Sequence, residues 1–218
     1  MRRSKRWFGI GLAIIILAAG LTAFFFATQT GPKKTVNNIR VACVGDSITN
    51  GTEYPDDLWM MLGSNYAVGN FGVGGATVSL ESEPYMNQTE FLNAKQFLPN
   101  IVVIMLGTND AYPTRQQYVG HFINDYKELI GGFQVLPSNP KIWIVLPPPF
   151  FNDYLGPNST IFVKDIIPLI KQTANELGLP TIDVYSPLVN HPEYFWDGVH
   201  PNSQGAKIIA TEIYNAIV

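Results

Sequence analysis

Five short, nearly continuous apolar runs alternate with longer segments of helical character in residues 38–218. The runs, which we predict to be β-strands, are residues 39–44, 66–71, 101–106, 141–146 and 181–185. Because they are apolar on both faces, they suit a parallel sheet that is covered on both sides. The predicted helices are residues 55–63, 88–97, 115–131, 161–177 and 203–217. The sequence therefore predicts an α/β protein, a three-layer α/β/α sandwich around a five-stranded parallel sheet.

A long apolar segment precedes this pattern. Residues 7–27 contain no charged side chain, and at about 1.5 Å per residue they would span about the 30 Å hydrocarbon core of a bilayer. Two interpretations stay open for residues 1–27, a cleaved signal peptide or a retained transmembrane signal-anchor. The apolar run is longer than the roughly 7–15 residues of a secretory signal, which favours the anchor. Residues 28–37 are predicted to be a linker to a single folded domain, residues 38–218.

The charges on the two sides of this segment differ. It is preceded by four basic residues, Arg2, Arg3, Lys5 and Arg6. This excess predicts that the N-terminus stays in the cytoplasm and that the domain is extracytoplasmic.

The part of the chain that follows this segment is acidic. Six of the 14 basic residues and none of the 17 acidic ones lie in residues 1–35. Residues 36–218 therefore contain eight basic and 17 acidic residues, a formal net charge of −9. Such acidity argues against a nucleic-acid partner, because binding phosphates needs clustered Lys and Arg.

Polar residues follow the predicted strands, and ligand sites in open parallel sheets lie beyond the carboxyl ends of the strands. The first three strands are followed by Asp46-Ser47, a glycine-rich turn at 72–75, and Asn109-Asp110, while Asp197 and His200 precede the last helix. The segment after the fourth strand, PPPFFNDY, has no obvious catalytic group. Taken singly, each of these four groups of polar residues and glycines has an ordinary structural explanation. Ser47 could cap a helix, the glycines and Asn109-Asp110 could form tight turns, and Asp197 and His200 could be a surface pair.

Together these residues supply the parts needed for acyl transfer. A serine hydroxyl is a weak nucleophile and needs a neighbouring base. His200 is one of three histidines and has Asp197 three residues before it. The oxyanion that forms needs donors, which the Ser47 and Gly75 N–H groups and the Asn109 amide can supply. We therefore predict Ser47, His200 and Asp197 as catalytic residues and Ser47, Gly75 and Asn109 as the oxyanion hole, with Asp46 and Asp110 forming turns.

Four blocks in this order, GDSIT, NFGVGGAT, LGTND and DGVHP, resemble the SGNH (GDSL-type) hydrolases. The resemblance covers residues 38–218 and implies a flavodoxin-like sandwich with strand order 2-1-3-4-5. It also implies a serine esterase mechanism without metal or cofactor, with Ser47, Gly75, Asn109, Asp197 and His200 at the matching positions. The wider sequence resembles the bacterial branch that includes acetylxylan and sialate O-acetylesterases. That likeness implies removal of small acyl groups, above all acetyl, from carbohydrate.

Several alternatives remain open at this point. The same site could hydrolyse lipid or thioester acyl chains, transfer an acyl group to a second sugar, or belong to a non-catalytic glycan-binding module. Six aromatic residues flank the predicted site, and they could either stack on sugars or cover the edge of the core: Phe150, Phe151, Tyr154, Tyr194, Phe195 and Trp196. The expected partners are an acylated small molecule or glycan, and a membrane through the N-terminal helix. No oligomeric state is indicated.

Overall fold

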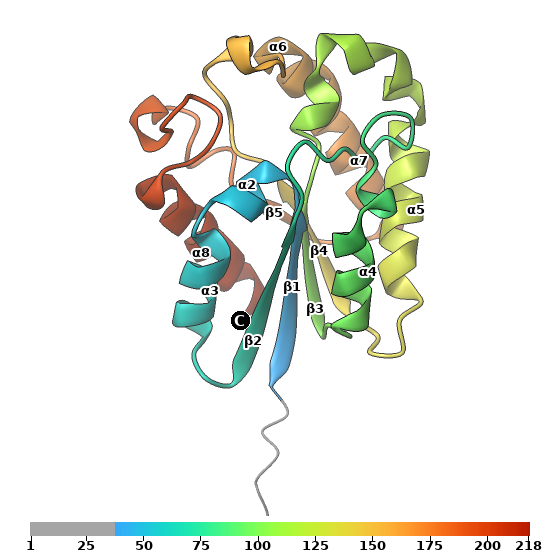
Figure 1. The fold of residues 1–218 in the computed structure, drawn as a ribbon, viewed down its shortest axis with the longest axis vertical. Helices are drawn as coiled ribbons and strands as arrows, with labels where there is room; N and C mark the ends of the chain where they lie inside the picture. Colours follow the sequence, from blue (N-terminus) through green and yellow to red (C-terminus); the bar gives the residue numbers. More distant parts are fainter. Residues whose placement is uncertain (1–37) are drawn as a thin grey trace, which may run out of the picture. The chain divides into compact units, whose positions relative to one another are not determined.

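The strands of the computed structural model form one parallel sheet in the order β2-β1-β3-β4-β5 (Figure 1). The structure describes residues 38–218, so the predicted signal-anchor (1–27) and linker (28–37) lie outside the described residues. None of the helices within residues 38–218 combines the length and the apolar character needed to cross a bilayer. The five-stranded parallel sheet and its strand order confirm the predicted α/β architecture.

The strands begin and end close to the predicted positions. They are β1 (Ile39–Gly45), β2 (Tyr66–Gly72), β3 (Ile101–Met105), β4 (Lys141–Leu146) and β5 (Thr181–Asp183). The last strand ends two residues earlier than predicted. The Asp183 carboxylate accepts hydrogen bonds from the Ser186 N–H (2.9 Å) and the Ser186 hydroxyl (2.6 Å), which turns the chain away from the sheet.

Two predicted helices are wrong in their first turns. The α-helices are α2 (Ser47–Gly51), α3 (Tyr54–Leu62), α4 (Thr89–Gln96), α5 (Phe122–Gln134), α6 (Ser159–Ile161), α7 (Ile167–Leu177) and α8 (Ser203–Ile217). The predicted helix 115–131 starts as a 3₁₀ segment, Pro113–His121, in which no side chain is buried, so no apolar stripe favours the α-helical period there. The predicted helix 161–177 contains a π-helical stretch, Phe162–Ile166. Pro168 follows it, and a proline lacks an N–H and clashes with the carbonyl four residues earlier.

The helices form two layers. On one face of the sheet lie α4, α5 and α7, and on the other lie α2, α3 and α8 (Figure 1). Along β1 the side chains alternate between the two cores: Val41 and Cys43 pack with α3 and α8, while Ala42 and Val44 pack with the other layer. All four are fully buried. This two-sided burial explains why β1 is a nearly continuous apolar run.

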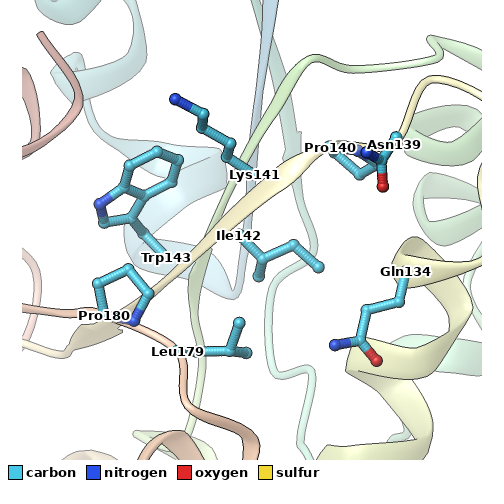
Figure 2. A pocket seen from close by; sticks show the side chains of 8 residues that line it. All are labelled: Gln134, Asn139, Pro140, Lys141, Ile142, Trp143, Leu179 and Pro180. Atoms are coloured by element: carbon cyan, nitrogen blue, oxygen red, sulfur yellow. The ribbon is translucent and has the colours of Figure 1, made fainter.

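The amino edge of the sheet contains a hollow of about 490 Å³ (Figure 2). The ladder between β4 and β5 begins with the pair Ile144–Thr181, so the first three residues of β4 extend past the start of β5. The hollow lies there, and Gln134, Lys141, Ile142, Trp143 and Leu179 are among the residues that line it.

Candidate active site

Three strand ends lie side by side at the carboxyl edge of the sheet, the upper end in Figure 1. Gly45, the last residue of β1, pairs with Gly72 of β2 on one side and Met105 of β3 on the other. The Val73 N–H donates to the Gly45 carbonyl (3.0 Å). A Cβ at Gly72 would lie 2.3 Å from the Asn50 nitrogen, so the glycine lets α2 pack against the end of β2. The segments that follow β1, β2 and β3 are therefore neighbours.

Ser47 is the first residue of the short helix α2. The helix cap is Asp46, whose Oδ1 accepts the Ile48 N–H (2.9 Å), so the Ser47 side chain is not used as the cap. A Cβ at Gly45 would lie 2.0 Å from Thr49 Oγ1 and 2.8 Å from the Met105 carbonyl oxygen. The glycine thus permits a sharp turn from strand to helix, and the half-buried Ser47 faces the loop that carries His200.

A chain of two hydrogen bonds joins Ser47, His200 and Asp197. The His200 Nε2 lies 2.9 Å from Ser47 Oγ, and the His200 Nδ1 lies 2.6 Å from Asp197 Oδ2. The sequence separation between serine and histidine is 153 residues. The structure therefore brings together the three predicted side chains, with the imidazole between the hydroxyl that it would deprotonate and the carboxylate that orients it.

The Asp197 carboxylate is held in its charged form. Partial burial raises its pKa, but the His200 N–H, the imidazole and the Val199 N–H outweigh this effect, and the pKa of Asp197 is lowered overall. Asp197 Oδ1 accepts the N–H groups of Val199 (2.9 Å) and His200 (2.7 Å). Both carboxylate oxygens are thus used, one fixing the loop and one orienting the imidazole.

The two other predicted oxyanion groups lie on the loops next to Ser47. Asn109 follows β3, is 8% exposed, and donates one amide hydrogen to the Ala76 carbonyl (3.0 Å). Arg115 Nη1 donates to the Asn109 carbonyl (2.8 Å) and holds this turn in place. Gly75 directly precedes Ala76 and has φ +78°, a conformation that side chains other than glycine rarely adopt. The loops after β2 and β3 are therefore joined through Asn109.

Two buried carboxylates, predicted to form turns, do bind backbone N–H groups. Asp110 accepts from Val78 (3.0 Å) and Ser79 (2.9 Å). Asp46 caps α2 through Oδ1, while its Oδ2 has no hydrogen-bond partner among the described residues. Burial raises the pKa of each carboxyl to about 6, although hydrogen bonds to the carboxylates oppose this effect.

The loop after β4 supports the 197–200 segment, which the sequence did not reveal. The Phe151 N–H donates to the Gly198 carbonyl (2.6 Å), and Asn152 Nδ2 donates to the Asp197 carbonyl (3.1 Å). Gly198 has φ +84°, and a Cβ there would lie 2.7 Å from Asn152 Cβ. The available signal was the position of PPPFFNDY after a predicted parallel strand, since the segment had no obvious catalytic group.

The aromatic residues near the site divide into two groups. Phe150 and Phe195 are buried in the core, and Tyr194 packs against the core and stacks on His191. Phe151, Tyr154 and Trp196 are exposed by 40%, 98% and 67%, respectively. The indole of Trp196 stacks on His200, with ring centroids 5.4 Å apart and an interplanar angle of 20°. Of the two interpretations, covering the core fits the buried rings and leaves the exposed ones available for ligands.

The other two histidines form pairs away from Ser47. His121 Nδ1 lies 3.0 Å from Glu81 Oε1, and His191 Nδ1 lies 2.8 Å from Glu193 Oε1. Both pairs are exposed to solvent. Within residues 38–218, no group of three or more His, Cys, Asp or Glu side chains is arranged to hold a metal ion.

The sequence model of the GDSL-like lipase/acylhydrolase family matches residues 43–208. An acetylxylan esterase from Xylanibacter ruminicola is 34% identical to this chain, over 85% of the chain and 44% of that protein. A GDSL esterase/lipase from Arabidopsis thaliana is 24% identical, over 55% of the chain and 54% of that protein. The chain thus spans about half the length of these two curated relatives.

Solved structures share the fold. A lipase/acylhydrolase from Enterococcus faecalis superimposes with a TM-score of 0.65 and 25% identity, covering 82% of this chain and 94% of its own. A carbohydrate acetylesterase from Sinorhizobium meliloti superimposes with a TM-score of 0.61 and 20% identity, covering 82% and 97%. The second likeness concerns the fold alone.

Proposed function

The chain belongs to the GDSL-like lipase/acylhydrolase family, and we propose that it is a serine esterase that removes small acyl groups, above all acetyl, from carbohydrate. The observation that carries this proposal is the hydrogen-bonded chain Ser47–His200–Asp197. A serine hydroxyl gains nucleophilic strength only beside a base, and the imidazole becomes a better base when a carboxylate supports the charge it acquires.

In the first half of the reaction, Ser47 Oγ attacks the ester carbonyl carbon while His200 Nε2 takes the hydroxyl proton. Asp197 holds the imidazole through Nδ1 and stabilises the imidazolium. The tetrahedral oxyanion accepts hydrogen bonds from the Ser47 N–H, the Gly75 N–H and the second amide hydrogen of Asn109. The Ser47 N–H suits this role, because the first N–H groups of a helix have no acceptor within that helix.

The first half ends when the bond between the carbonyl carbon and the alcohol oxygen breaks and His200 gives its proton to the departing alcohol. The acyl group remains on Ser47 as an ester. His200 then takes a proton from water, the resulting hydroxide attacks the acyl carbon, and the acid leaves as Ser47 recovers its proton. One ester and one water become one acid and one alcohol, and no step requires a metal or cofactor.

One comparison supports carbohydrate as the alcohol part. The 34% identical relative is an acetylxylan esterase. We also propose that the domain acts outside the cytoplasm, anchored by residues 7–27, because the only strongly basic flank of that segment precedes it. Protease treatment of intact cells tests this location: an extracytoplasmic domain is degraded, whereas a cytoplasmic marker survives.

The activity is tested with acetylated xylan and with p-nitrophenyl esters of increasing chain length. We expect the wild type to release acetate and to prefer short acyl chains, and Ser47→Ala to lose at least about 10⁴-fold in kcat. Ser64→Ala is the matched control, since Ser64 is exposed in the loop between α3 and β2. Activity that survives Ser47→Ala, or that falls equally in Ser64→Ala, contradicts the proposal.

A further inference from the structure

A flat aromatic surface lies beside the predicted base. The Trp196 indole is 67% exposed although its ring stacks on the His200 imidazole. Its backbone is fixed: the Trp196 N–H donates to the His200 carbonyl (3.1 Å), and Phe195 pairs with Pro201 in a β-bridge. One part of the indole therefore touches His200, and the remainder faces solvent in a defined orientation. A rigid, exposed ring loses little conformational freedom when a ligand packs on it.

The position of His200 determines which part of a substrate lies near this ring. Its Nε2, which is 2.9 Å from Ser47 Oγ, must also reach the oxygen of the departing alcohol. In the proposed mechanism the acyl carbonyl, in contrast, accepts hydrogen bonds from Gly75 and Asn109. The alcohol part must therefore approach the 194–200 loop, on which Trp196 is the exposed aromatic residue.

We propose that Trp196 forms a binding subsite for a pyranose ring in the alcohol part of the substrate. One face of a pyranose presents several C–H bonds, which pack favourably on the electron-rich face of an indole. This inference rests on the proposed function and adds a specific contact to it. Trp196 then determines specificity for the alcohol, whereas the oxyanion groups act on the acyl carbonyl of any ester.

Binding can be measured without turnover. Xylotetraose, which carries no ester, is titrated against Ser47→Ala, Ser47→Ala/Trp196→Ala and Ser47→Ala/Trp196→Phe by calorimetry. We expect the Trp196→Ala double variant to bind about five- to tenfold more weakly, and Trp196→Phe, which keeps an aromatic face, to retain most of the affinity. Ser47→Ala/Trp59→Ala is the control, because Trp59 is an equally large side chain that is 51% exposed on α3.

Turnover separates a sugar contact from mere support of the imidazole. With Ser47 intact, Trp196→Ala should raise KM for acetylated xylo-oligosaccharides about five- to tenfold more than for triacetin, which has no sugar ring. Equal losses on both esters, unchanged xylotetraose affinity in the Trp196→Ala double variant, or no xylotetraose binding by Ser47→Ala overturns the inference, while the esterase proposal stands. If the wild type hydrolyses neither ester, the esterase proposal fails, and the titration still decides whether Trp196 binds sugar.

Discussion

At the carboxyl edge of the sheet, side chains from distant parts of the chain are hydrogen-bonded to one another, whereas at the amino edge they line an open hollow. At the carboxyl edge, His200 forms hydrogen bonds with Ser47 (2.9 Å) and with Asp197 (2.6 Å). The amino edge has about 490 Å³ of space beside Gln134, Lys141 and Trp143, and none of these side chains forms a comparable chain (Figure 2). A hollow of this volume therefore occurs at the amino edge without the hydrogen-bonded side chains that distinguish the carboxyl edge.

The difference follows from how the strands end. Gly45, Gly72 and Met105 lie level with one another, so the loops after β1, β2 and β3 pack together and satisfy one another's polar groups. The amino-edge hollow lies where β4 extends past the start of β5, which begins only opposite Ile144. In this fold, the convergence of strand ends is therefore the feature that points to the candidate site.

After Ser47→Ala, the largest loss of activity at the carboxyl edge is expected for Asp197→Asn. The asparagine Oδ1 still accepts the Val199 and His200 N–H groups, so the loop is kept, but its NH₂ group now faces the imidazole Nδ1. His200 is then held in the wrong tautomer, and we expect kcat to fall about 10³–10⁴-fold. Steady-state kinetics measures this, with a thermal melt to show that the fold is retained. A loss below tenfold would mean that the carboxylate does not support the base.

Asn109→Ala should have the next largest effect. Loss of one oxyanion donor lowers kcat by about 10²–10³-fold with a small change in KM, because the interaction strengthens in the transition state. Asn109 also bonds Ala76, so the melting temperature must be measured in parallel. Asn65→Ala, an exposed asparagine at the amino edge, is the control and should keep wild-type kcat. A rise in KM without loss of kcat would assign Asn109 to substrate binding.

The sequence was sufficient to predict the sheet, because the central strands β1 and β3 are buried over most of their length and are therefore nearly continuous apolar runs. It was also sufficient to name Ser47, His200 and Asp197 as partners, because few chemically suitable groups follow the strands. It could not show the support from Asn152, which acts by its position rather than its chemical type. Nor could it separate buried Phe195 from exposed Trp196, since neighbouring aromatic residues look alike until the loop is folded.

A smaller effect is expected on stability, from the buried Asp46. Burial raises its pKa to about 6 from 3.8, so the folded state binds its proton more tightly than the unfolded state. The stability from this group is present below about pH 4 and is lost as the pH rises through about 6. Asp46→Asn keeps the Oδ1 cap for the Ile48 N–H. We expect its free energy of unfolding, relative to that of the wild type, to rise by about 1–3 kcal/mol between pH 4 and pH 7.

Urea unfolding at pH 4, 5, 6 and 7 measures this difference, which should grow between pH 4 and pH 7. Asp110→Asn is the contrasting variant. Its pKa is raised in the same direction, but both carboxylate oxygens accept backbone N–H groups, so an amide there loses one acceptor and destabilises the fold. A constant difference between Asp46→Asn and the wild type across this range would show that Asp46 ionises with its ordinary pKa.

The smallest effect is expected at the amino edge, and it tests the comparison directly. Gln134 is exposed at the end of α5 and lines the hollow, so Gln134→Ala should change stability by no more than about 0.5 kcal/mol. We expect kcat and KM for acetylated xylan to stay within about twofold of the wild type, because the hollow and the Ser47–His200–Asp197 chain lie at opposite ends of the strands. Lys141→Ala, on the other side of the hollow, should behave in the same way. A rise in KM for the polysaccharide in both variants, with unchanged turnover of triacetin, would mean that a long glycan reaches both edges of the sheet, and the amino edge would then count as part of the binding surface.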